Sequence, residues 1–296
     1  MSLPAAYLAV ILVWSTTPLG VKWSSVGISP AAGAFGRILL ATLLGWTLVR
    51  LAGIAVPFHR KAMRVYAISN IGLFVGLLCT YIGAQFIPSG LISILFGMSP
   101  VISAFLARYL LNEPPFTLSK WLAMAMGIAG LLVVFRHELV SMRGGLGGFL
   151  IVLVGVFCFS LSAVMIKREG NVVEPVAQTV GALTLATPLY AMSALVMGFN
   201  IQSVEPRTVG AIIYLAVFGS FVGFFCYFYV LKHMQASTVA LTTMITPVLA
   251  LTLGSLLNGE TITPSLLTGA VMIGCALLLY YWGDSLLAKI SVQRAL

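Results

Sequence analysis

Charged residues are scarce in this sequence, and their scarcity excludes most soluble folds. Asp, Glu, Lys and Arg make up 8% of the 296 residues, whereas hydrophobic residues make up 60%. A soluble domain carries about 25% charged residues, which cover its surface in water. The mean hydropathy is +1.08. We therefore predict an integral membrane protein in contact with a lipid bilayer.

Acidic residues are absent from the middle of the apolar runs, and the three histidines also lie outside these runs. An ionisable group at the bilayer midplane is costly and is kept for function, and proton-coupled carriers usually place one there. Obligate proton coupling is therefore disfavoured. A neutral or zwitterionic solute is favoured over a bare cation, while binding of a cation to aromatic faces stays open. The seven acids are Glu113, Glu138, Glu169, Glu174, Glu205, Glu260 and Asp284.

The apolar runs also lack any group of residues suited to catalysis or to metal binding. They contain no paired acids, no histidine cluster and no Gly-x-Ser-x-Gly motif. Free cysteine in such runs behaves as a small hydrophobic residue. We therefore predict no enzymatic activity, no cofactor, no metal and no disulfide. The four cysteines are Cys79, Cys158, Cys226 and Cys275.

The net charge of +9 comes from 16 Lys and Arg scattered through short loops. They form no basic stripe with interleaved aromatics, so we expect no nucleic-acid partner. Basic residues gather at the cytoplasmic ends of membrane helices. With a cytoplasmic N-terminus, four of them (Lys22, Arg136, Arg143, Arg207) lie outside and eleven lie inside, which favours both termini in the cytoplasm. The eleven are Arg50, Arg60, Lys61, Arg64, Arg108, Lys120, Lys167, Arg168, Lys232, Lys289 and Arg294.

The apolar runs are about 20 residues long, the length of a helix that spans ~30 Å of hydrocarbon. A β-barrel would show short alternating segments instead. We predict an all-α integral membrane protein with ten transmembrane helices and a short cytoplasmic tail at 284–296. The N-terminus lacks the basic flank of a signal peptide, so the first run is expected to be retained. The predicted spans are 3–22, 30–50, 64–86, 88–111, 118–136, 146–166, 175–198, 207–231, 237–258 and 264–283.

The sequence contains two copies of one unit. Residues 72–81 return 147 positions later as 219–228, with five of ten residue types identical. Each copy holds five spans, and because five is odd, the second copy enters the membrane from the opposite side. Such inverted repeats are related by a pseudo-two-fold axis in the membrane plane, as in many secondary transporters. We predict repeats at 3–136 and 146–283, joined by a linker at 137–145, with the function where the copies meet.

Glycines and prolines recur at matching positions in the two copies. Gly72 with Gly76, and Gly219 with Gly223, are small residues four apart, a spacing that lets helix backbones approach closely. We predict that they pack the two halves together rather than bind a ligand or a second molecule. The protein is expected to be a monomer or a weak homodimer.

Pro100 and Pro247 lie about 15–18 Å deep in their spans, near the midplane. Proline removes its own N–H and crowds the carbonyl four residues back, and bent midplane helices often build transporter sites. We interpret both as hinges, with a simple packing kink as an equal alternative. The hydroxyls of Ser99 and Thr246, which precede them, are available either to a substrate or to their own helix backbone.

Aromatic residues crowd the third and eighth predicted spans and offer walls for a substrate cavity. Asn70, Phe74 and Tyr81 share one helical face, opposite the glycines of the third span. The alternative is that these rings face lipid, with Tyr81 as an interfacial anchor. The predicted substrate-binding residues are Trp14, Asn70, Phe74, Tyr81, Ser99, Phe221, Phe225 and Thr246.

Arg37 is the one charged residue expected within a span. We predict that its head extends to the outer interface, and the alternative is a contact with an anion or carboxylate. Lys22 and Lys167 are predicted to cap helix C-termini, where a cation meets the negative end of the helix dipole.

Four short motifs lie along the two copies: Trp14-Ser15, Phe35-Gly-Arg37-Ile-Leu-Leu-Ala41, Leu110-Leu-Asn-Glu113-Pro and Leu257-Asn-Gly-Glu260-Thr. With these motifs the sequence resembles EamA-type members of the drug/metabolite transporter superfamily over almost its whole length, and more narrowly the YddG-type exporters of aromatic amino acids and methyl viologen.

The resemblance implies a ten-helix basket in the bacterial inner membrane, alternating access, and a cavity lined by spans 1, 3, 4, 6, 8 and 9. The small multidrug members carry a Glu in the first span that this chain lacks, so their proton antiport is not carried over. We predict an exporter of small amphiphilic metabolites, above all aromatic amino acids and, less strongly, aromatic cations. A channel or facilitator for other solutes, or a non-transporting scaffold, is the alternative.

Overall fold

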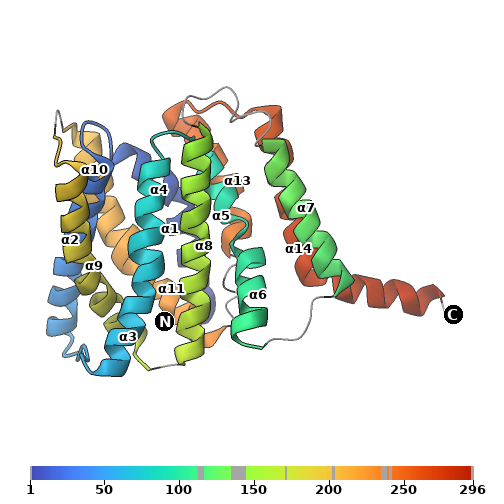
Figure 1. Cartoon of the computed structure of the whole chain (residues 1–296), viewed down its shortest axis with the longest axis horizontal. Coiled ribbons are helices and arrows are strands. Elements are labelled where there is room, and N and C mark those ends of the chain that lie inside the picture. The colour runs from blue at the N-terminus through green and yellow to red at the C-terminus, as the bar shows by residue number, and fades with distance from the viewer. Residues whose placement is uncertain are drawn as a thin grey trace.

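The computed structural model is built from helices that lie roughly parallel to one another (Figure 1). Within the residues described, no strand forms, and one antiparallel bridge joins Ile28 to Ile201. The predicted linker, up to Gly144, and Glu113 lie outside the described residues. The structure describes residues 2–112, 117–134, 145–170, 172–201, 204–234, 239 and 242–294.

Two of the helical segments are π-helices, η1 and η3, and each continues directly into an α-helix. In chain order the helices are α1 (Leu3–Trp23), α2 (Pro30–Leu51), α3 (Arg60–Asn70), η1 (Ile71–Gly76), α4 (Leu77–Gly83), α5 (Ser89–Phe96), α6 (Ser99–Leu110), α7 (Leu118–Val134), α8 (Gly145–Glu169), α9 (Pro175–Met197), α10 (Pro206–Tyr214), η3 (Leu215–Val222), α11 (Gly223–His233), α13 (Thr242–Asn258) and α14 (Pro264–Arg294).

Seven helical stretches are long and apolar enough to cross a membrane, and three shorter apolar helices accompany them. A lipid bilayer offers no hydrogen-bond partner to the backbone, so a helix, which satisfies its own amides, suits these runs. The prediction of an all-helical membrane protein is confirmed, while the ten-helix inverted repeat stays a prediction. The seven are Leu3–Trp23, Pro30–Leu51, Arg60–Gly83, Ser89–Leu110, Gly145–Glu169, Pro175–Met197 and Pro206–His233; the shorter three are Leu118–Val133, Thr246–Asn258 and Pro264–Tyr280.

Helix ends carry the residues that the backbone requires there. Pro30, Pro175 and Pro206 begin their helices, where the missing N–H costs nothing because the first amides have no intrahelical partner. Lys22 and Arg50 lie in the last turns of α1 and α2, where a cation complements the helix dipole. These signals explain why the predicted boundaries of most spans agree with the helices to within a few residues.

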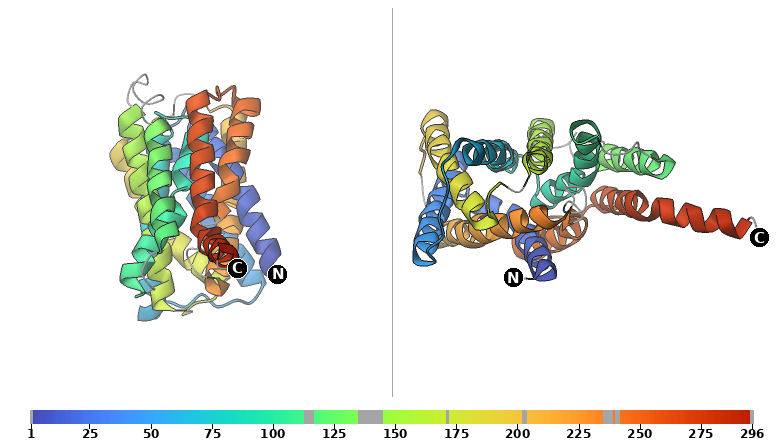
Figure 2. Two further views of the ribbon diagram at one scale, coloured as in Figure 1. Left: turned by 90° about the vertical axis from the view of Figure 1, so that its right-hand side faces the viewer. Right: turned by 90° about the horizontal axis from the view of Figure 1, so that it is seen from below.

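Helix α14 differs from the prediction because it continues past residue 283 to Arg294. No proline or glycine follows Gly283 to end it. Its Asp284 accepts hydrogen bonds from Ser119 at the start of α7 and from Thr117 just before it. α7 and α14 lie side by side at the right-hand edge of Figure 1, and the end of α14 projects away from the other helices (Figures 1 and 2).

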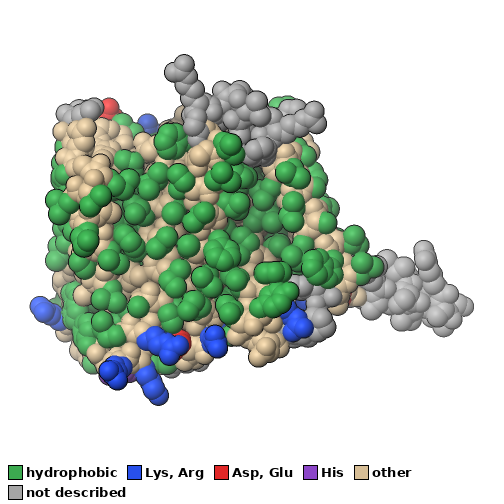
Figure 3. Space-filling view, in the orientation of Figure 1, with side chains coloured by type: hydrophobic (Ala, Val, Ile, Leu, Met, Phe, Trp, Pro, Cys, Tyr) green, Lys and Arg blue, Asp and Glu red, His purple; other side chains and the backbone are tan. Residues whose placement is uncertain are grey.

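The face of the molecule in Figure 3 is apolar along most of the height of the helices. Leu8, Leu43, Leu132 and Leu195 are among the large hydrophobic side chains that are more than half exposed. Lysine and arginine side chains gather along the lower edge of this view, where α3 begins at Arg60. An apolar band of this size suits contact with lipid rather than with water.

Close contact between glycines joins α8 to the rod formed by η1 and α4. A Cβ atom added at Gly155 would lie 2.8 Å from the carbonyl oxygen of Gly76, and one added at Gly76 would lie 3.0 Å from that of Gly155. At the end of α4, a Cβ on Gly83 would lie 2.8 Å from the carbonyl oxygen of Gly148. Small residues thus let the two backbones touch, as the spacing of Gly72 and Gly76 predicts.

We expect Gly155→Ala to destabilise the protein, because the new methyl group has backbone rather than a movable side chain against it. Overpacking of this kind costs about 1–3 kcal/mol, which thermal unfolding of the purified protein in detergent measures. Gly147→Ala is the matched control on the same helix: nothing lies within 4 Å of its added Cβ, so the better helix propensity of alanine should leave stability equal or raised. Equal unfolding temperatures for the two variants would contradict the backbone contact.

Candidate functional site

A cavity lies among the helices and holds about 660 Å³ of space free of atoms, part of it open to the outside. Segments from both copies of the sequence repeat contribute to its wall, and α7, α9 and α14 do not. The lining residues are Trp14, Thr17, Pro18, Arg37, Gly72, Gly76, Leu77, Thr80, Ile92, Ser93, Phe96, Phe159, Gly219, Phe224 and Thr246.

Aromatic rings form one wall of the cavity. Trp14 of α1 meets Phe159 of α8 edge to face, with 5.3 Å between ring centroids, and these two positions correspond in the two copies at an offset of 145 residues. Phe96 and Phe224 lie 6.0 and 6.5 Å from Phe159. Tyr227 packs behind, 5.1 Å from Trp14. Aromatic pairs at such distances attract one another through their quadrupoles, so the wall offers flat apolar surface to a solute.

Both π-helices border the cavity. η1 contributes Gly72 and Gly76, and η3 contributes Gly219. A π turn adds one residue to the helix, which rotates the following side chains by about 100° relative to a regular α-helix. Because π segments recur at functional sites, two of them at equivalent sequence positions mark this region as the candidate site.

The four predicted packing glycines lie at contacts between the two copies. Gly72 packs against Phe159 of α8, with an added Cβ 3.2 Å from that ring, and Gly223 lies against Val13 of α1. An added Cβ at Gly219 would lie 3.0 Å from Nη2 of Arg37. The glycine side of the third span thus both packs on a neighbour and faces the cavity.

The predicted hinge prolines lie in different settings. The fourth predicted span is broken at residues 97 and 98, and Pro100 stands in the first turn of α6, so its missing N–H leaves no helical bond unmade. Pro247 lies inside α13. It lines a second, apolar cleft between α13 and α14, together with Ile94 of α5. Neither proline lines the aromatic cavity.

Of the eight predicted substrate-binding residues, the cavity lining contains Trp14 and Thr246. Asn70 donates to the carbonyls of Tyr66 and Ala182, and Tyr81 accepts a hydrogen bond from Ser24. These contacts hold both side chains inside helix–helix packing, away from the cavity.

The other four predicted residues also lie outside the lining. Phe74 packs on Tyr190 of α9, and Phe225 on Tyr229. Phe221 lies against Gly45 of α2, and Ser99 is buried with no partner for its hydroxyl among the residues described. In the third span the glycine side borders this cavity, and a substrate role for the face of Asn70, Phe74 and Tyr81 stays a prediction.

Arg37 corrects the prediction that its head reaches the outer interface. The side chain is 1% exposed, its Nε donates to Ser220 of η3 at 2.7 Å, and it lines the cavity. Extension toward water would have required open space along α2, which the contact with η3 fills instead.

Sequence reasoning also missed Ser93, Phe96 and Phe224, which carry no motif that sets them apart from other residues of their spans.

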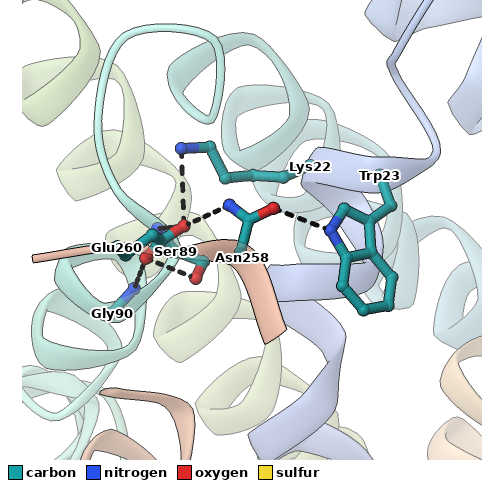
Figure 4. A network of polar contacts seen from close by, with 6 residues as sticks. All are labelled: Lys22, Trp23, Ser89, Gly90, Asn258 and Glu260. Carbon is teal, nitrogen blue, oxygen red and sulfur yellow. Dashed lines mark hydrogen bonds and ion pairs between the residues drawn. The ribbon is translucent and has the colours of Figure 1, made fainter. Parts of the chain in front are cut away.

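Glu260, in the loop between α13 and α14, is the centre of a polar network at one end of the helices (Figure 4). Its carboxylate accepts from Ser89 Oγ at 2.8 Å and from the backbone amides of Ser89 and Gly90 at the start of α5. Lys22 Nζ lies 3.6 Å away, and Asn258 donates at 3.0 Å. We call Lys22, Ser89, Asn258 and Glu260 the Glu260 clasp.

Neighbouring contacts extend the clasp to α10. Trp23 donates to Asn258 Oδ1 at 2.9 Å, and the Arg207 guanidinium lies 3.8 Å from the centroid of the Trp23 ring, a cation–π contact. Arg207 also donates to the carbonyl of Leu257 at 2.9 Å. The end of α1, the start of α5, the loop after α13 and the start of α10 are thus joined.

The Glu260 carboxylate stays ionised at ordinary pH. Burial raises the pKa of Glu260, but the Ser89 hydrogen bond, the Lys22 charge and the Asn258 amide together outweigh it, so the pKa lies below its usual value. A depressed carboxylate pKa gives an interaction that is complete above the usual glutamate pKa of about 4.3 and is lost only as pH falls through the lowered value. The clasp is therefore no proton switch between pH 5 and 8.

Known proteins resemble this chain over nearly its full length. The model of the EamA-like transporter family matches residues 3–136 and 146–282. The chain is 25% identical over 279 residues to "Uncharacterized transporter YoaV" of Bacillus subtilis (strain 168), a match that covers 91% of this chain and 93% of that protein. It is also 25% identical over 262 residues to "Uncharacterized inner membrane transporter YedA" of Escherichia coli (strain K12), covering 87% and 83%.

A solved structure titled "Crystal structure of protein" shares the fold, with a TM-score of 0.73, 15% identity, and coverage of 97% of this chain and 98% of the other. At this identity the likeness concerns the fold alone. The narrower YddG-type resemblance stays a prediction. The two family matches span most of the sequence, and the chain therefore belongs to the EamA-like transporter family, as a multi-pass membrane transporter.

Proposed function

We propose that this protein is a secondary carrier that exports small amphiphilic metabolites, above all aromatic amino acids, by alternating access. The observation that carries the proposal is the aromatic cavity, which is built from segments of both sequence copies and holds one charged group. Flat apolar surface suits an aromatic side chain, and a few polar groups fix the orientation of a ligand in such a site. Export across the bacterial inner membrane is part of the same proposal.

The packing of the helices supports an inverted repeat. Under the sequence repeat α2 corresponds to α9, and α7 to α14, and each of these helices packs on its own counterpart. α1 packs on η3 and α11, and its counterpart α8 packs on η1 and α4. α1 also packs on α13, as α8 does on α6. A pseudo-two-fold axis produces such exchangeable pairs, and it relates the halves of many alternating-access carriers.

The distribution of charge supports a cytoplasmic position for both termini. The basic edge of Figure 3 includes the start of α3 at Arg60, and positive charge accumulates on the cytoplasmic side of membrane proteins. The stretch Arg60–Gly83 begins at this edge and extends to the opposite end of the helices. Ser89 of the clasp comes shortly after Gly83 and therefore lies at that opposite end. In this orientation the Glu260 clasp lies on the outer side.

The clasp is suited to hold the outer end of the carrier closed. Hydrogen bonds to a charged group contribute about 1.5–3 kcal/mol each, and conformations that exchange in a carrier differ by a few kcal/mol. Loss of several such bonds is therefore enough to change which state is populated. The helix break before Pro100 and the kink site at Pro247 give the moving segments places to bend.

The carrier function is tested by counterflow of radiolabelled tryptophan in liposomes that contain the purified protein. We expect uptake that saturates with concentration and accelerates when the liposomes hold unlabelled tryptophan. Uptake without saturation would indicate a channel. No uptake of tryptophan above that of empty liposomes would contradict the proposed substrate class.

The clasp is tested by Glu260→Ala, which leaves two amides of α5 and Lys22 without their acceptor. Spin labels on cysteines introduced at Val26 and Ile262, both exposed near the clasp, report the separation of the outer loops in a cysteine-free background. We expect the distance distribution to shift to longer values. Glu174→Ala, which removes the Lys232 ion pair at the basic edge, is the control and should leave it unchanged. An unaltered distribution in Glu260→Ala would rule out the clasp as a gate.

The hinge is tested by Pro247→Ala, which restores an N–H inside α13. We expect slower counterflow with unchanged unfolding temperature, because a straighter helix resists bending. Pro188→Ala inside α9 is the matched control, since α9 does not border the cavity, and it should transport at the wild-type rate. Equal rates in both variants would mean that Pro247 is only a packing kink.

A further inference from the structure

The guanidinium of Arg37 is a buried charge without a counter-charge. The side chain is 1% exposed. Its Nε donates to the neutral hydroxyl of Ser220, and its Nη1 has no hydrogen-bond partner among the described residues. The ion pairs found in the described part of the chain join other residues, namely Lys22 with Glu260, Arg64 with Glu169 and Lys232 with Glu174.

Such an arrangement leaves a place for an acceptor that none of the described residues supplies. Arginine keeps its charge in proteins, and a charge removed from water is normally paired or hydrogen-bonded. Arg37 lines the aromatic cavity, so a solute in that space is the group that reaches it. A planar guanidinium matches a carboxylate in geometry as well as in charge.

Ser93 places a second polar group, a hydroxyl that can donate or accept, on the same cavity. Its Oγ is buried and has no partner in the described structure. Thr17 and Thr80, which also line the cavity, differ because they donate to carbonyls of their own helices at 2.8 and 2.9 Å. The charged group on this cavity that lacks a partner among the described residues is thus a cation, and it favours an anionic group in the ligand.

The charged group has no equivalent in the second copy of the repeat. At the offset of 145 residues that relates Pro30 to Pro175, the position of Arg37 is occupied by Ala182. The cavity is therefore polarised by a charge from one copy only, while the aromatic pair Trp14 and Phe159 is shared between both copies. A ligand in it has one preferred orientation, with its anionic end toward α2.

We propose that Arg37 is the carboxylate anchor of the cavity and that the solutes of this carrier carry a carboxylate beside an aromatic group. This inference rests on the proposed function and narrows it. Aromatic amino acids fit, and aromatic acids without an amine fit as well. Aromatic cations that lack a carboxylate are excluded, because they would bring a second positive charge to Arg37.

The test uses three probes that share one ring: tryptophan, indole-3-propionate and tryptamine. Their apparent dissociation constants are measured from the ligand dependence of thermal unfolding of the purified protein, since a ligand that binds the folded state stabilises it. We expect wild-type protein to bind both carboxylates at least about 10-fold more tightly than tryptamine. Arg37→Gln should weaken the carboxylates by about 10- to 100-fold, the range for a hydrogen bond to a charged group, and should leave tryptamine equal or tighter.

Two further variants separate recognition from structural support. Arg37→Lys keeps the charge but loses the planar fork, so it should retain a smaller preference for carboxylates, and it decides the question if Arg37→Gln fails to fold. Ser220→Ala removes the structural contact of Nε but leaves the charge, so the ratio of carboxylate to amine affinity should persist even if stability falls.

The outcomes distinguish this inference from the carrier function. Saturable tryptophan counterflow by a protein that binds tryptamine as tightly as indole-3-propionate would overturn the anchor and leave the carrier standing. An unchanged affinity ratio in both Arg37 variants would do the same. Binding of none of the probes by wild-type protein, with no tryptophan counterflow, would overturn both proposals.

Discussion

The positive charge of Arg37 is the constraint on which the rest of the cavity depends. Burial of a guanidinium among apolar side chains is unfavourable unless an acceptor meets it, and the sequence places no acid in the middle of any apolar run. Ser220 satisfies one N–H of Arg37, and Nη1 is left unpaired among the described residues. The protein therefore offers an unpaired charge, and the proposed carboxylate of the solute completes it.

The surrounding helices make room for such a ligand by departing from regular geometry. Glycines at the π-helices and along α8 bring backbones into contact beside the cavity, so side-chain volume is removed where the halves meet. Aromatic rings then fill the wall with flat surfaces. The ion pairs of the described residues lie at the ends of the helices, at the Glu260 clasp and at Arg64 and Lys232. A carrier needs an apolar exterior, a central cavity and polar contacts at the ends of the helices that can break.

Much of the fold was predictable from the sequence. Apolar runs of about 20 residues, prolines at helix starts and cations in last turns define the helices, because these signals act within one segment. Close packing at Gly72 and Gly76 followed from their spacing. The continuation of α14 beyond residue 283 was missed, since the partners of Asp284, Thr117 and Ser119, belong to another segment.

The cavity was less predictable, because it depends on contacts between segments. The π turns of η1 and η3 have no residue signature of their own. The turn of η1 rotates the helix face on which Phe74 and Tyr81 were assigned to the cavity. The position of the Arg37 side chain could not be predicted for the same reason. The sequence allowed either a head that extends to the interface or an anion contact. The packing of η3 against α2, with the Ser220 hydroxyl accepting a hydrogen bond from Arg37, decides for the buried position.

A crystal or electron-microscopy structure of the protein with bound tryptophan tests the account most directly. We expect the carboxylate within hydrogen-bond distance of Arg37 Nη1, at about 2.7–2.9 Å, and the indole ring against Trp14, Phe96 or Phe159. Tryptophan bound outside the aromatic cavity, or bound in it with its amine rather than its carboxylate toward Arg37, would contradict the account.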